Sequence, residues 1–257
     1  MNLNSITSVF DTKMIILLSE TILVYFLYNY FELNLQLDFT IMSVAIVFPL
    51  VFSITSAYQR RQDSIGEFAV FRNKIIDLSN IFYSVDKTNK TDYEKLFFSL
   101  VELQDIFVNY LKDSSPENNF KKVREKRKEI FLIIDSYKRL YNEREKDSII
   151  RVKNELFQSA EKLRGLKIHS TPISLRKYCL IFIFLSPLFY NTQLVSLKIS
   201  SNLTSETVIS LLMSVIVSFI LIALYNVQDY IENPFDQKGL DDLKLNKMDV
   251  SKSESLY

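Results

Sequence analysis

Four stretches of the chain are almost entirely apolar, and strongly polar sequence separates them. They cover residues 14–31, 39–57, 178–197 and 207–227, and the last three contain no Asp, Glu, Lys or Arg. The hydrocarbon core of a bilayer is about 30 Å thick, so a helix of about 20 apolar residues crosses it. The pattern therefore predicts four transmembrane helices rather than buried helices of a soluble protein.

Glu20 is the only ionisable side chain inside the first stretch. An ionisable residue at membrane depth commonly faces the protein interior and has a function. If the first span is shifted towards residues 21–31, Glu20 lies near the interface instead. The sequence leaves both interpretations open.

The region between the second and third stretches has the spacing of amphipathic helices. Apolar residues recur there at intervals of three and four, as in Leu96, Leu100, Leu103 and Phe107, which places them on one helix face. Polar breaks at 86–91 and 113–119 separate the expected helices. The sequence thus predicts an all-α fold.

These patterns divide the chain into four segments. We expect an N-terminal segment with spans one and two, a cytoplasmic helical region, a segment with spans three and four, and a cytoplasmic tail. Their predicted bounds are 1–57, 58–177, 178–227 and 228–257.

Basic side chains gather on one predicted side of the membrane. Of the 31 Lys and Arg residues, 25 lie between residues 60 and 177 and four follow the last span. The loop between spans three and four contains only Lys198, and the loop between spans one and two contains none. Positive charge favours the cytoplasmic side. We therefore expect a multi-pass membrane protein with both termini in the cytoplasm.

The densest basic run, residues 121–128, is compatible with a nucleic acid or an anionic lipid as partner. Glutamates such as Glu125 and Glu129 interleave with it, a pattern typical of a solvated helix face with ion pairs. We predict no nucleic-acid partner, although this charge can attract small anions.

The chain offers few residues for catalysis or cofactor binding. It has one cysteine, Cys179, one histidine, His169, and three glycines, none near another. These numbers exclude a Cys/His zinc site within one chain and a glycine-rich phosphate loop. We expect no enzyme, no cofactor and no metal centre.

A distinctive motif follows the last apolar stretch. Glu232, Asn233, Pro234 and Phe235 come directly after it, and Asp-Asp-Leu-Lys-Leu occupies 241–245. Proline lacks an N–H and stops a helix, so the motif predicts a sharp turn at the membrane exit, with a structural or gating role for its four residues. Together with the four-span layout, these residues resemble the bestrophin family, in which similar motifs follow the last membrane helix.

The resemblance implies five subunits around a central pore, with the second span lining its neck. Ala-Tyr-Gln-Arg at 57–60 is similar to the end of that span in bacterial bestrophins, a register that puts Val44, Phe48 and Phe52 at the hydrophobic neck positions. Their spacing of four also places them on one helical stripe. Rings of such residues can gate by dewetting. The alternative is that they face lipid or another helix.

Two features of the predicted neck bear on conduction. Pro49 leaves the carbonyl of Ala45 without its helical donor, so a kink or an exposed carbonyl there can affect gating. Phenylalanine presents a partly positive ring edge, which suits a dehydrated anion better than a cation.

The resemblance also implies a second, cytoplasmic constriction. Thr171 and Pro172 are similar to the family's Ile-Pro entry to the third span, where the residue before the proline narrows the pore. We therefore expect Thr171 there, with Ile168 nearby. Five threonine side chains around the pore would hold more water than five isoleucine side chains.

Calcium binding is not expected. The acidic run that helps animal bestrophins bind Ca²⁺ is diluted here, leaving Asp236, Asp241 and Asp242 as the only candidate ligands. Hard cations need several convergent oxygens. The tryptophan-containing motif that follows the second span in the family is also absent, since the chain has no Trp.

The sequence therefore predicts a bestrophin-like homopentameric channel in a lipid bilayer, passing chloride or other small anions. Two alternatives remain open. Acidic residues near the pore mouths, such as Glu32, Asp38 or Asp63, would favour cations. A non-conducting scaffold or sensor would use the helical cytoplasmic region to bind a partner.

Overall fold

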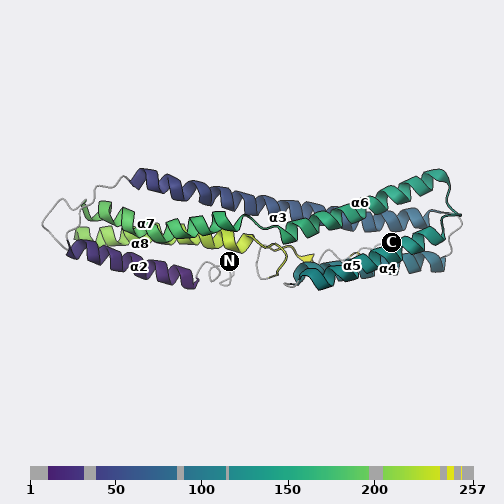
Figure 1. Cartoon of the computed structure of the whole chain (residues 1–257), viewed down its shortest axis with the longest axis horizontal. Helices are drawn as coiled ribbons and strands as arrows, with labels where there is room; N and C mark the ends of the chain where they lie inside the picture. The colour runs from purple at the N-terminus through teal and green to yellow at the C-terminus, as the bar shows by residue number, and fades with distance from the viewer. Residues whose placement is uncertain are drawn as a thin grey trace. The chain divides into compact units, whose positions relative to one another are not determined.

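The computed structural model describes residues 11–31, 39–85, 90–113, 116–196, 205–237, 242–245 and 250. Within them the chain divides into two compact units. Unit 1 comprises Met1–Gln59 and Thr171–Glu232, and unit 2 comprises Arg60–Ser170 and Asn233–Tyr257. The described helices are α2 (Thr12–Tyr30), α3 (Phe39–Tyr83), α4 (Lys90–Lys112), α5 (Pro116–Ser136), α6 (Glu143–Ile168), α7 (Ile173–Ser196) and α8 (Ser205–Ile231) (Figure 1).

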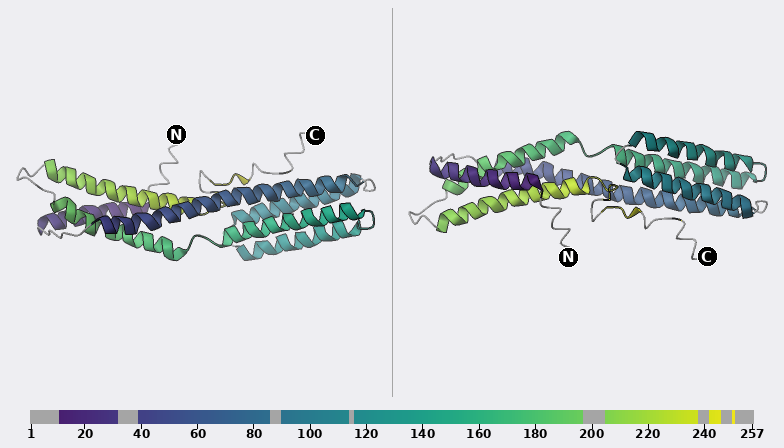
Figure 2. Two further views of the ribbon diagram at one scale, coloured as in Figure 1. Left: turned by 90° about the horizontal axis from the view of Figure 1, so that it is seen from above. Right: turned by 90° about the horizontal axis from the view of Figure 1, so that it is seen from below.

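Helices α2, α7 and α8 lie side by side in unit 1 (Figures 1 and 2). Their facing sides and two residues of α3 form a continuous apolar core. Its buried members are Met14, Leu17, Ile46, Leu50, Cys179, Ile183, Leu221, Ile222 and Tyr225.

A seam of buried hydrogen bonds crosses this apolar unit. Thr21 on α2 and Ser218 on α8 lie 2.6 Å apart through their hydroxyl oxygens, and the Tyr190 hydroxyl on α7 bonds to Ser218 as well. Asn191 on α7 accepts a bond from Ser214 on α8 and donates to the Thr21 carbonyl at 3.3 Å. Hydrogen bonds of this kind hold membrane helices together where hydrophobic attraction is weak. They therefore fix the packing of all three helices.

Unit 2 is a helical bundle with a larger apolar core. The second part of α3 and helices α4, α5 and α6 supply most of it, including the buried rings of Phe71, Phe82 and Phe107. The segment after α8 adds Phe235, Leu243, Leu245 and Val250 to the same core. The amphipathic spacing of the sequence is thus realised as a bundle with one buried stripe on each helix.

Local signals explain where several helices begin. The Asn142 side chain caps α6 by accepting from the Glu145 N–H at 2.9 Å, and the Glu145 carboxylate accepts from the Asn142 N–H at 2.8 Å. This reciprocal capping box satisfies two backbone donors that a helix start leaves unpaired. The Asp11 carboxylate accepts from the Thr12 N–H at the start of α2.

Helix α3 runs without a break through the predicted boundary at residue 57. Residues 57–60 contain no proline or glycine, so nothing there stops a helix that has begun upstream. The units divide at Gln59, Ser170 and Glu232, whereas the predicted segments divide at 57, 177 and 227. Helix α7 likewise begins at Ile173, before the predicted start of the third span.

Three stretches of the described residues are long and apolar enough to cross a membrane. They are α2, α8 and the stretch Glu143–Val195, which contains α6 and most of α7. They correspond to the predicted first, fourth and third spans. The predicted second span is the first part of α3. That it also crosses the bilayer, and that both termini are cytoplasmic, stay predictions.

Lys126 is a buried cation in unit 2 with two carboxylate partners. It bonds to Glu102 on α4 and to Glu129 on its own helix at 2.9 Å, while Ser99 donates to Glu129 at 3.2 Å. The bond from Lys126 lowers the pKa of Glu129. Burial opposes the charge of Lys126, but the bonds to Glu102 and Glu129 outweigh it and raise its pKa.

We expect Lys126→Met to remove a pH-dependent part of the stability of unit 2. The lowered pKa of Glu129 contributes stability above its unfolded value, about 4.3, and that contribution is lost as the pH falls below it. Because Glu129 is half exposed, the contribution should be about 1 kcal/mol or less. Thermal unfolding followed by far-ultraviolet circular dichroism between about pH 5 and pH 3 measures it.

The exposed Lys128 gives the matched control. Lys128→Met should keep the wild-type decline in stability towards acid pH, because Lys128 is exposed and lies outside the cluster of Lys126, Glu102 and Glu129. An unchanged decline in Lys126→Met would show that the Lys126 cluster does not cause it.

Candidate functional site

The first part of α3 has two contrasting faces. Ile46, Leu50 and Ala57 are fully buried in unit 1. Val44, Phe48 and Phe52 are 59%, 61% and 54% exposed. A shift of two residues turns a helix by about 200°, so the predicted neck residues lie on the face opposite the core.

The exposed stripe is an ordered apolar surface. The rings of Phe48 and Phe52 meet edge to face, with centroids 4.6 Å apart and an interplanar angle of 87°. Pro49 lies between them inside a continuous helix. Its missing N–H leaves the Ala45 carbonyl without the usual helical donor.

The apolar exposure extends beyond the three predicted residues. Ile41, Val47 and Val51 are also exposed on α3. A contiguous apolar surface of this kind needs lipid or another protein surface to cover it. Among the residues that the structure describes, Val44, Phe48 and Phe52 stay exposed, so they are available to contacts outside the subunit.

Glu232 joins two ends of unit 1 through buried hydrogen bonds. Its carboxylate accepts from the Thr171 N–H and from the Thr171 hydroxyl, both at 2.7 Å, and from the Gln228 side-chain amide at 3.3 Å. All three residues are buried. Thr171 lies two residues before the first residue of α7, and Glu232 directly follows α8. The carboxylate therefore links the start of one helix to the end of the other.

The sequence did not predict this contact. Thr171 and Glu232 are 61 residues apart, and nothing in the local pattern pairs them. The available signal was the placement of Gln228 and Glu232 four residues apart at the end of an apolar helix. That spacing puts both polar side chains on one helix face, where they need a common partner if buried.

The remaining motif residues belong to unit 2. The Asn233 side chain accepts from the Phe235 N–H at 3.3 Å, which forms the predicted sharp turn. The Pro234 carbonyl accepts from the Leu243 N–H at 2.9 Å. Phe235 is fully buried in the unit 2 core. The Asn-Pro-Phe part therefore anchors the segment after α8, and a role for Pro234 or Phe235 in gating stays a prediction.

The two predicted constriction residues differ in exposure. Ile168, at the end of α6, is 48% exposed. Thr171 is buried, and its hydroxyl is occupied by Glu232. Within its unit, Thr171 has a structural partner, which leaves Ile168 as the more accessible of the two. A constriction at either residue stays a prediction.

The candidate calcium ligands are only partly described. Asp236 and Asp242 are half-buried, and Asp241 lies outside the described residues. In the described part of the chain, no three His, Cys, Asp or Glu side chains come together as metal ligands. Because Asp241 lies outside that part of the chain, the expectation that the three aspartates bind no calcium stays a prediction.

Three helices of unit 1 also meet at an ionic contact that the sequence did not predict. The Asp229 carboxylate on α8 pairs with Lys13 on α2 and with Arg176 on α7, each at 3.2 Å. The side chains are partly exposed. Isolated exposed pairs contribute about 0–1 kcal/mol each, so this contact orients the helix ends more than it stabilises them.

No protein-family model matches the sequence, and no curated protein sequence matches it. Solved structures do match its fold. A bacterial bestrophin homologue from Klebsiella pneumoniae with a tryptophan-to-alanine mutation has a TM-score of 0.79 at 14% identity, covering 95% of this chain and 96% of that chain. The same homologue with a leucine-to-threonine mutation has a TM-score of 0.78 at 14% identity, covering 95% and 98%.

A further structure, described as a membrane protein with a leucine-to-alanine mutation, has a TM-score of 0.74 at 16% identity, with coverage of 95% and 98%. Combined with the apolar helices, these matches define the class of the protein: an all-helical membrane protein. More particularly, the chain has the fold of the bacterial bestrophin homologues. The resemblance predicted from the Glu-Asn-Pro-Phe motif is confirmed at the level of the fold.

Proposed function

We propose that this protein is an ion channel that passes chloride or other small anions passively through a homopentameric pore. The observation that carries the proposal is the exposed stripe of Val44, Phe48 and Phe52 on the face of α3 opposite the unit 1 core. Covering this stripe by four further copies of α3 would give three stacked apolar rings. The five-subunit arrangement is the one that the resemblance to bestrophins implies.

The chemistry of the stripe supports a gated pore. Apolar rings form a constriction that can empty of water and so stop conduction. The edge-to-face packing of Phe48 and Phe52 directs ring edges and faces in fixed directions. Ring edges carry partial positive charge, which favours an anion at the point where it loses water.

Charge in the helical region supports anion selectivity. Residues 60–177 carry 25 basic and 18 acidic side chains. An excess of positive charge raises the local concentration of anions and their rate of entry. We propose that unit 2 acts in this way on the cytoplasmic side, with Ile168 as the more accessible candidate for a second constriction.

The ratio of anion to cation permeability tests the proposal. The purified protein in planar bilayers, with a gradient of KCl across the membrane, should give a reversal potential near that of chloride. A potential near that of potassium would replace the proposal by a cation channel. No conductance together with a monomer by native mass measurement would favour a non-conducting scaffold or sensor.

A further inference from the structure

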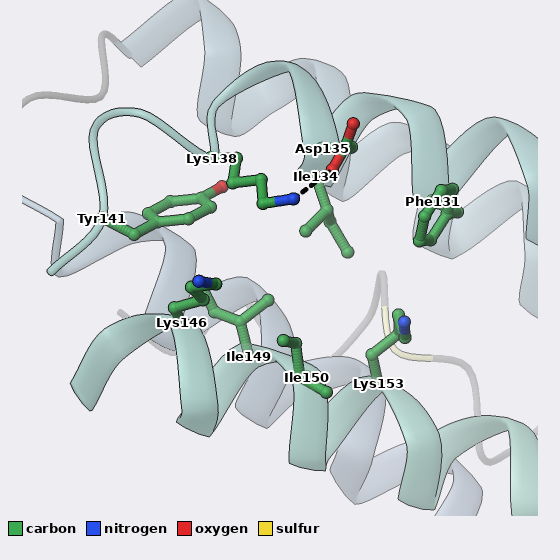
Figure 3. A pocket seen from close by; sticks show the side chains of 9 residues that line it. All are labelled: Phe131, Ile134, Asp135, Lys138, Tyr141, Lys146, Ile149, Ile150 and Lys153. Atoms are coloured by element: carbon green, nitrogen blue, oxygen red, sulfur yellow. Dashed lines mark ion pairs between the residues drawn. The ribbon is translucent and has the colours of Figure 1, made fainter. Parts of the chain in front are cut away.

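A cavity of about 200 Å³ lies in unit 2 between α5 and the start of α6 (Figure 3). Side chains of α5 and the following turn face those of α6 across it. The residues that line it are Phe131, Ile134, Asp135, Lys138, Tyr141, Lys146, Ile149, Ile150 and Lys153.

The lining combines apolar walls with positive charge. Phe131 and Ile134 on α5 face Ile149 and Ile150 on α6 (Figure 3). Three lysines but only one carboxylate, that of Asp135, complete the lining. An apolar pocket with a few polar groups that converge on it is the usual form of a small-molecule site. Here the charged groups of the lining have a net positive charge.

Lys153 is the lysine best placed to take a new anionic partner. Lys138 pairs with Asp135 and Lys146 pairs with Glu143, each at 3.7 Å. The Lys153 ammonium instead lies 5.0 Å from the centroid of the Phe131 ring. Lys153 makes no ion pair with the residues that the structure describes.

The surroundings of Lys153 favour an anion beside it. Burial lowers the pKa of Lys153, and the positive charge of Arg127 lowers it further. Both effects oppose the charged form. A carboxylate in the cavity would relieve them by pairing with the ammonium.

Tyr141 supplies a second feature. Its ring lines the cavity, and its hydroxyl is buried with no hydrogen-bond partner among the residues that the structure describes. A buried hydroxyl without a partner costs free energy. The unsatisfied hydroxyl marks the end of the cavity away from Lys153 as a second polar position (Figure 3).

We propose that this cavity binds a small carboxylate with a single apolar ring or a short apolar chain, held by Lys153 at its charged end. The size fits, because an apolar protein cavity of about 150 Å³ accepts benzene. The isoleucines and Phe131 would enclose the apolar part, while Lys138 and Lys146 add positive potential.

Benzoate is the probe for the test. With the full-length protein in detergent, ligand-observed saturation-transfer NMR should give saturable benzoate binding with a Kd on the order of 1 mM, in the range expected for a ligand of this size. Neutral benzamide should bind at least about tenfold more weakly, because it lacks the charge-assisted bond. Hexanoate tests whether a short chain can replace the ring.

Lys153→Gln should weaken benzoate binding at least about tenfold, since a charged hydrogen bond is lost. Lys128→Gln, on an exposed lysine of α5 outside the cavity, should leave it unchanged. Ile150→Trp should abolish benzoate binding, because the larger side chain fills the cavity. Ile150 is partly exposed, so the protein can accommodate the change. This second variant keeps the proposal testable if Lys153→Gln does not fold.

The absence of saturable benzoate binding, or equal binding of benzamide, would overturn the proposal. Unchanged benzoate binding in Lys153→Gln would also overturn it. Where that variant does not fold, unchanged binding in Ile150→Trp would do so. The measurement does not depend on ion conduction. A failure here therefore leaves the channel proposal standing, and a failure of the channel proposal leaves this one testable.

Discussion

Changing Val44, Phe48 and Phe52 together to alanine is expected to raise single-channel conductance by roughly threefold or more, because the apolar constriction widens and stays wet. The three side chains are exposed on the single chain, so their removal should cost little folding stability. Single-channel recordings in planar bilayers, with symmetric KCl, measure the change.

The matched control lies on α8. Leu212, Ile216 and Ile220 have the same spacing of four and similar exposure. Alanine at these three positions removes comparable apolar surface from another face of unit 1 and should leave conductance unchanged. If the α3 variant conducts like the wild type, or both variants conduct more, these α3 residues do not form a neck.

Glu232→Ala is expected to lower the free energy of unfolding of unit 1 by about 2–3 kcal/mol. The substitution leaves the Thr171 N–H, the Thr171 hydroxyl and the Gln228 amide without their common buried acceptor, and unsatisfied buried donors are costly. The single cysteine gives the readout. Cys179 is fully buried in the unit 1 core, so its reaction with a thiol-reactive fluorogenic dye on heating reports opening of this unit.

Two comparisons sharpen the Glu232 test. Glu232→Gln keeps the shape and one acceptor oxygen, so it should destabilise less than alanine. Thr55→Ala is the control, because Thr55 is exposed and its hydroxyl donates at 2.9 Å to the Val51 carbonyl of its own helix. Wild-type dye kinetics in Glu232→Ala would show that the carboxylate does not stabilise the ends of α7 and α8.

The sequence predicted most of the architecture because the helices are long and their hydropathy is extreme. Helices α2 and α8 follow directly from uncharged or nearly uncharged runs of sufficient length. The length of α3 was not predicted, since composition changes at residue 58 while the backbone remains helical. Hydropathy reports the surroundings of a helix, and helix continuity depends instead on the absence of breakers.

The candidate site was predictable only where a helical stripe defines it. Val44, Phe48 and Phe52 share a face by spacing alone, and the structure places that face away from the core. The burial of Thr171 was not predictable, because it depends on Glu232, which is distant in sequence. The cavity beside Lys153 was likewise hidden, since its walls come from two helices that meet only in the folded bundle.

The hydrogen-bonded seam of unit 1 has a consequence for biosynthesis. Thr21 emerges from the ribosome early, but its partner Ser218 is 197 residues further along, a delay of about 10–40 s at ordinary rates of translation. Meanwhile the Thr21 hydroxyl can donate to the Leu17 carbonyl of its own helix, at 2.8 Å in the folded protein. The Thr21 hydroxyl of α2 therefore has a hydrogen-bond acceptor before α8 is made. The three helices of unit 1 can pack together only after α8 has been synthesised.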